Sequence, residues 1–72
     1  MVKITYRYSF FELSGKPKRF IESKPECTIK GYGVSTDTVT LCVLFSTSES
    51  YKRITTEIEL KFKIKPFQIV YI

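Results

Sequence analysis

The sequence predicts a single all-β domain of five to six mainly antiparallel strands, and three observations favour this class. The chain has only 72 residues, too few to divide a core between two domains. It is rich in β-branched and aromatic residues, whereas alanine, the best helix former, is absent. Finally, Ile58, Leu60, Phe62 and Ile64 alternate with charged residues between positions 54 and 65. A period of two places these two sets on opposite faces of a strand.

The N-terminal third is expected to form strands joined by turns. A first strand is predicted from Val2 to about Leu13, because its apolar residues occupy alternate positions. Ser14-Gly15-Lys16-Pro17 has the composition of a turn, and Lys18–Glu22 is expected to be a short second strand paired with the first. Proline cannot donate to a sheet, so Pro25 separates this strand from a third, Glu26 to about Lys30.

The middle of the chain is expected to contain the central strand. Gly31-Tyr32-Gly33 is expected to be a kink, and Ser35-Thr36-Asp37 a turn. The fourth strand, Thr38–Phe45, carries apolar residues on both faces, including Cys42 and Leu44. Strands that are apolar on both faces are typically buried. We therefore expect this strand to be the most buried one.

The C-terminal third is expected to supply the last two strands. Residues 46–50 form a polar loop, Tyr51–Lys65 the fifth strand and Phe67–Ile72 the sixth. The last segment has no charge, no proline and strong β propensity, so it would promote aggregation as an unpaired edge. We expect it to be paired, either within an OB-like or SH3-like barrel or rolled sheet, or with a second copy in a homodimer.

Several chemistries are excluded by residue type. The chain has no histidine, so a histidine-assisted Ser or Cys nucleophile is impossible. Cys27 and Cys42 alone cannot complete a zinc site, and we expect them to be free thiols. Glu57 and Glu59 are expected on a solvated face among lysines, and no phosphate-binding glycine loop is present. The prediction is a protein that is not an enzyme and uses no metal or cofactor.

The sequence shows no targeting signal. The N-terminus is a charged strand rather than an apolar helical run, and no apolar stretch reaches the length of a membrane span. The expected location is the cytoplasm, without a membrane partner.

The charge pattern favours single-stranded DNA or RNA as the ligand. The net charge is +5, and basic residues gather between positions 16 and 24 around Phe20. Positive charge that follows a phosphate backbone, combined with aromatic faces for bases, is the usual basis of single-strand binding. The predicted nucleic-acid-binding residues are Lys16, Lys18, Arg19, Lys24, Lys30 and Tyr32.

Two short motifs resemble those of nucleic-acid-binding families. Lys30-Gly31-Tyr32-Gly33 resembles the start of the ribonucleoprotein motif of cold-shock and RNA-recognition domains, which implies that Tyr32 is a stacking platform on an exposed sheet. The pattern departs from this motif at Val34-Ser35. Gly15-Lys16-Pro17 in a basic hairpin is similar to the small β-sheet single-stranded-DNA-binding proteins of filamentous phages.

The alternative function is a protein-interaction module, encoded by a virus or plasmid, that inhibits or joins a larger complex. Its surface would be the C-terminal strand and the aromatic residues Phe11, Tyr51 and Tyr71. The position of the charges separates the two hypotheses. Convergence of the basic residues on one surface favours nucleic acid, whereas dispersal favours a protein partner.

Overall fold

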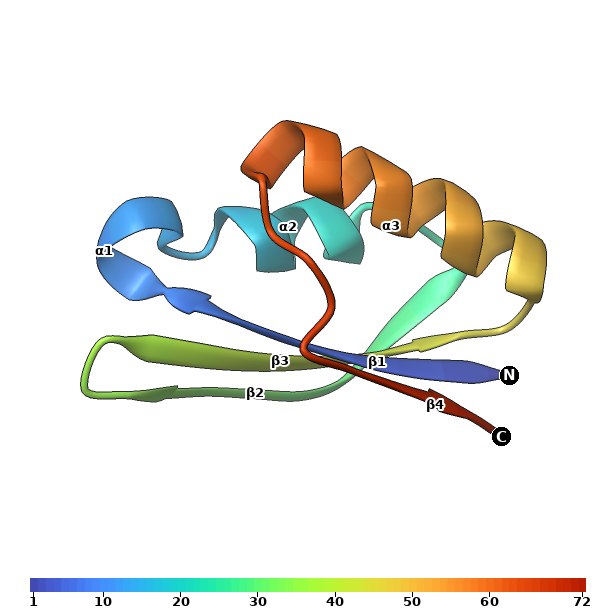
Figure 1. The fold of residues 1–72 in the computed structure, drawn as a ribbon, viewed down its shortest axis with the longest axis horizontal. Helices are drawn as coiled ribbons and strands as arrows, with labels where there is room; N and C mark the ends of the chain where they lie inside the picture. Colours follow the sequence, from blue (N-terminus) through green and yellow to red (C-terminus); the bar gives the residue numbers. More distant parts are fainter.

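The computed structural model describes all residues from 1 to 72 and contains four strands and three helices (Figure 1). In chain order these are β1 (Val2–Ser9), α1 (Phe10–Leu13), α2 (Lys16–Glu22), β2 (Cys27–Ser35), β3 (Thr38–Phe45), α3 (Ser48–Phe62) and β4 (Gln68–Tyr71). The strands form one sheet in the order β2-β3-β1-β4, and every neighbouring pair is antiparallel. Apart from the additional short helix α1, this order of elements is the β-α-β-β-α-β, or split βαβ, arrangement that ferredoxin-like domains have.

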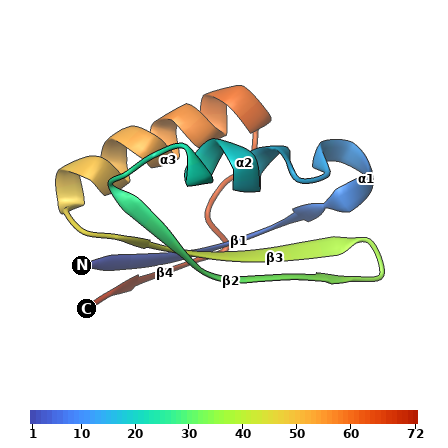
Figure 2. The same ribbon diagram turned by 180° about the vertical axis from the view of Figure 1, so that it is seen from behind.

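The hydrophobic core lies between the sheet and the helices. Figures 1 and 2 show α2 and α3 over the same face of the sheet, while no element covers the opposite face. The alternation in β1 and β3 buries every second side chain, as in the fully buried pairs Ile4–Val43 and Tyr6–Leu41. Ile21 of α2 and Ile54 and Ile58 of α3 close the core from above.

The predicted β domain is confirmed in part. An antiparallel sheet is present, and β3 has the predicted bounds and lies between β1 and β2. The turn at Thr36 is also found, with a positive φ of 58°. However, the sheet has four strands and is open, so the expected five to six strands and the closed barrel are not found.

The prediction of a strand over Tyr51–Lys65 is wrong, because residues 51–62 belong to α3, which ends at Phe62. Ile54 and Ile58 are fully buried, whereas Leu60, which the strand would bury, is 74% exposed. A hydrogen bond from the Ser50 backbone N–H to Thr47 Oγ1 (3.1 Å) caps the helix at its start. Lys63 adopts a left-handed conformation at its end, with φ 59°. The exposure of Leu60, two residues from the buried Ile58, together with this cap, therefore identifies a helix.

The second strand expected over Lys18–Glu22 is also a helix. Pro17 lies in the first turn of α2, where its missing N–H costs nothing, and it is buried together with Ile21 four residues later. Lys18 Nζ and a Glu22 carboxylate oxygen form an ion pair of 3.0 Å across one turn. The first strand is shorter than predicted, since β1 ends at Ser9.

Asp37, in the turn between β2 and β3, stabilises the start of the short helix α1, which directly follows β1. The Phe11 backbone N–H donates to the Asp37 carboxylate at 2.9 Å, and Ser9 Oγ donates to the other carboxylate oxygen at 2.6 Å. The first bond satisfies a backbone N–H that a helix start leaves free, and the second holds the Asp37 carboxylate in place.

The glycine-flanked segment at 31–33 is part of β2 and not a separate kink. The irregularity occurs one residue earlier, where the register shifts between Ile29 and Gly31 and leaves Lys30 as the extra residue of a bulge. The two cysteines are free, as predicted. Cys27 pairs with the buried Phe45 and Cys42 with Gly31, so the two thiols lie on opposite faces of the sheet.

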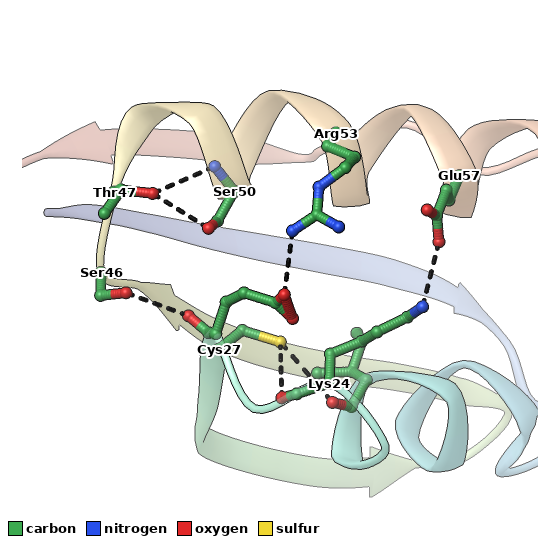
Figure 3. A network of polar contacts seen from close by, with 9 residues as sticks. Lys24, Cys27, Ser46, Thr47, Ser50, Arg53 and Glu57 are labelled. Carbon is green, nitrogen blue, oxygen red and sulfur yellow. Dashed lines mark hydrogen bonds and ion pairs between the residues drawn. The ribbon is translucent and has the colours of Figure 1, made fainter.

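Two ion pairs connect α3 to the segment between α2 and β2 (Figure 3). Arg53 Nη2 lies 2.9 Å from a Glu26 carboxylate oxygen, and Lys24 Nζ lies 3.3 Å from a Glu57 carboxylate oxygen. The hydrogen bond from Arg53 holds the pKa of Glu26 below its ordinary value. These pairs help to position α3 next to α2.

The lowered pKa of Glu26 predicts an acid-sensitive contribution to stability. A carboxyl group with a lowered folded-state pKa stabilises the fold above its unfolded-state pKa, and this stabilisation is lost as the pH falls through the folded value. Urea unfolding across the acid range should therefore show Glu26→Gln less stable than wild type near neutral pH, with the difference vanishing at low pH. Glu12→Gln, at an exposed carboxylate without an ion pair, should follow wild type throughout. A pH-independent gap for Glu26→Gln would contradict this prediction.

Candidate nucleic-acid interface

A basic groove lies between α2 and α3 on the helical side of the molecule. Its volume is about 380 Å³, within the range of small-ligand pockets. It is lined by Lys16, Arg19, Phe20, Ser23, Lys61 and Phe62. Three of these side chains carry positive charge and none carries negative charge. The groove therefore suits an anionic ligand.

The local geometry of α2 explains this arrangement. Lys16, Arg19, Phe20 and Ser23 are spaced three, four and seven residues apart, so they share one side of a helical path. Pro17 and Ile21 occupy the other side and are buried against the sheet. The packing of Ile21 thus turns the basic side of α2 toward the last turn of α3, where Lys61 and Phe62 lie.

Two aromatic rings form the floor of the groove. Phe20 and Phe62 pack edge to face, with ring centroids 5.8 Å apart and an interplanar angle of 80°. Two ammonium groups lie near the Phe20 ring, Lys24 Nζ at 4.8 Å and Lys61 Nζ at 5.0 Å from its centroid. Cation–π attraction of this kind holds the lysine side chains beside the rings. Charge and aromatic surface are therefore adjacent.

The charges in the groove are not neutralised by ion pairs. The three salt bridges of the structure use Lys18 with Glu22, Lys24 with Glu57, and Arg53 with Glu26. Lys16, Arg19 and Lys61 take part in none of them. Phosphate groups could therefore bind these three side chains without displacing a carboxylate.

The structure brings together some of the residues predicted from the sequence. Lys16 and Arg19 line the groove, and Lys24 borders it through its contact with Phe20. Lys18 points elsewhere, because its Nζ lies 5.2 Å from the centroid of the Tyr32 ring. Lys30 is exposed at the bulge of β2.

Tyr32 does not lie where the ribonucleoprotein resemblance implied. It is opposite the buried Leu41 in the ladder, so its side chain is on the helix-covered side of the sheet. Its strand, β2, is also an edge strand. The exposed sheet face instead carries side chains such as Lys3, Arg7 and Thr40, which alternate with the buried ones.

Two groove residues, Lys61 and Phe62, were not among the predicted site residues. The alternation over residues 54–65 predicts a strand, and a strand would not place these two residues beside α2. A signal was present in the spacing of Ile54, Ile58 and Phe62, which also fits a helical stripe.

The structure shows neither a metal-binding cluster nor a membrane-spanning helix. No group of three or more Cys, Asp and Glu side chains is arranged to hold a metal ion. None of the three helices combines the length and apolar character needed to span a membrane. Comparisons with protein-family models, with curated proteins and with solved structures gave no match.

Proposed function

We propose that this protein binds single-stranded nucleic acid in the groove between α2 and α3. The observation that carries the proposal is the convergence of Lys16, Arg19 and Lys61, from two helices, around the Phe20–Phe62 floor. Cationic side chains next to exposed aromatic surface are the combination that single-strand binding uses.

The groove residues have distinct roles in this proposal. Lys16, Arg19 and Lys61 bind phosphates, and Arg19 can donate two parallel hydrogen bonds to one phosphate. Phe20 offers a face on which a base can stack once the ammonium group of Lys61, which takes part in no ion pair, turns from the ring to a phosphate. Lys24 remains paired with Glu57. A single strand can present its bases in this way, whereas a duplex keeps them paired and stacked. We therefore expect a preference for single strands.

The binding test uses fluorescence anisotropy with a labelled oligonucleotide, single-stranded or duplex. Affinity for the single strand should fall steeply between about 50 and 200 mM salt, because each neutralised phosphate releases counterions. Phe20→Leu, which retains an apolar side chain, should weaken single-strand binding by about 1–3 kcal/mol, the usual contribution of a stacked base. The matched variant Tyr32→Leu should bind like wild type.

The outcomes of this test distinguish the proposed groove from another binding position, and nucleic acid from another class of ligand. A loss of affinity in Tyr32→Leu and not in Phe20→Leu would place the ligand at β2 and contradict the proposed groove. Absence of binding at low salt would contradict a nucleic-acid ligand altogether. The second candidate function, a protein-interaction module acting through the C-terminal strand, would then be favoured by the exposed apolar residues of β4.

A further inference from the structure

The strand β4 forms an apolar edge of the sheet that no other element covers. It pairs with β1 on one side only, and Figures 1 and 2 show no strand or helix beyond its other side. The segment from 67 to 72 has no charged residue, and Tyr71 and Ile72 are 69% and 73% exposed. An edge of this composition readily pairs with another strand.

The opposite edge of the sheet is protected in the ways that edge strands usually are. β2 contains a bulge at Lys30, with its exposed charge, and two glycines at Gly31 and Gly33. Bulges and lysines disfavour the addition of a further strand. The chain therefore protects one edge and leaves the other open.

The hydrogen-bond pattern identifies the free backbone groups of β4. Met1 and Ile72 exchange both possible bonds: the Ile72 N–H donates to the Met1 carbonyl at 2.9 Å, and the Met1 amino group donates to the Ile72 carbonyl at 3.3 Å. Because such pairs alternate along an antiparallel ladder, Val70 also faces β1 through its backbone. The N–H and C=O groups of Ile69 and Tyr71 therefore point to the open edge.

We propose that a second copy of this chain binds at this edge, with the two β4 strands antiparallel about a twofold axis at Val70. Ile69 then lies opposite the partner's Tyr71, and Tyr71 opposite the partner's Ile69. Each pair exchanges two hydrogen bonds, so the free backbone groups of both residues are satisfied in both copies. The interface is closed by symmetry, and it joins the two sheets into one continuous sheet.

A hollow beside β4 provides an independent reason to choose a second copy as the occupant. The hollow has a volume of about 240 Å³ and is lined by Tyr51, Thr55, Thr56, Glu59, Pro66 and Ile69. Ile69 and Tyr71 share the helix-covered side of the sheet, because they pair with the buried Ile4 and Val2. The proposed register therefore places the partner's Tyr71 next to Ile69, at the hollow. In each copy the Tyr71 hydroxyl lies 3.5 Å from the Tyr51 hydroxyl of the same chain. It can accept from Tyr51 and donate to the Glu59 carboxylate or a threonine oxygen of the other copy.

The test is the mass of the full chain by sedimentation equilibrium without nucleic acid. Wild type should have twice the chain mass of 8.4 kDa. Val70→Glu should be a folded monomer, because the two new carboxylates would face each other across the twofold axis. Within one chain, the introduced carboxylate would instead lie opposite Lys3, a favourable pair. Val34→Glu, the same change on the exposed part of β2, should remain dimeric.

A mixture of variants provides a stricter test of the register. Val70→Glu mixed with Val70→Lys should form a mixed dimer, because opposite charges then meet at the axis. A monomeric wild type at every concentration would overturn the proposal. So would a dimer that persists in Val70→Glu, or a mass that rises beyond the dimer with concentration. None of these results depends on whether the groove binds nucleic acid, so the two proposals can fail separately.

Discussion

Ile58→Ala should destabilise this protein by about 2–5 kcal/mol, whereas Leu60→Ala should change its stability by less than about 0.5 kcal/mol. Ile58 is on the face of α3 that packs against the core and is fully buried, so its truncation leaves a cavity. Leu60 lies two residues away and is 74% exposed, so its truncation removes few contacts. Small domains have total stabilities of only about 5–15 kcal/mol, and the first variant should therefore be close to unfolding.

Urea unfolding followed by circular dichroism measures both variants. The pair separates a helix from a strand over this segment, because a strand would place Ile58 and Leu60 on the same face. Equal losses of stability would mean that both side chains are buried, and the assignment of α3 would be wrong. Lys52→Ala, at an exposed position of the same helix, is the control for a general effect of substitution.

Charge reversal of the groove is expected to abolish nucleic-acid binding. In the variant Lys16→Glu, Arg19→Glu, Lys61→Glu, the carboxylates would repel phosphate at each proposed contact. All three side chains are exposed, so the fold should be retained. Anisotropy titration at low salt should detect no complex with the single strand that wild type binds.

The matched control reverses Lys3, Arg7 and Lys30, which lie on β1 and β2 away from the groove. It changes the net charge by the same amount and replaces the same residue types. If the groove is the site, this control should bind with at most a modest loss from long-range electrostatics. Equal losses in the two variants would show that total charge decides binding, and the groove would then have no special role.

The sequence alone determined the sheet at the centre of the fold. β3 has its predicted bounds, because Thr38–Phe45 combines β-branched residues with a turn on its N-terminal side. The start of β1 and the turn at Thr36 were also predictable from local composition. The impossibility of histidine chemistry follows from the residue count alone. The two thiols are free because the fold places Cys27 and Cys42 on opposite faces of the sheet.

The basic part of the groove was partly predictable, because Lys16, Arg19 and Lys24 are close together in the sequence. The opposite wall of the groove, which α3 forms, was not predictable from the sequence. Lys61 and Phe62 are distant in the chain, and they reach Phe20 only because α3 packs beside α2. Contacts of this kind depend on the relative position of two helices, which no local pattern specifies.

Only the tertiary structure decided between strand and helix for residues 18–22 and 51–62. The buried residues of the two helices that contain these segments are spaced by four: Pro17 and Ile21 in α2, and Ile54 and Ile58 in α3. Four is a multiple of the strand period and also close to one helical turn, so both structures place such residues on one face. Leu60 distinguishes a strand from a helix, because only a strand would bury it beside Ile58. It is apolar and yet exposed, so the sequence alone does not show on which face it lies. Burial against the sheet decides in favour of the helices. The four strands expose one apolar face, and α2 and α3 cover it with the side chains that form the core.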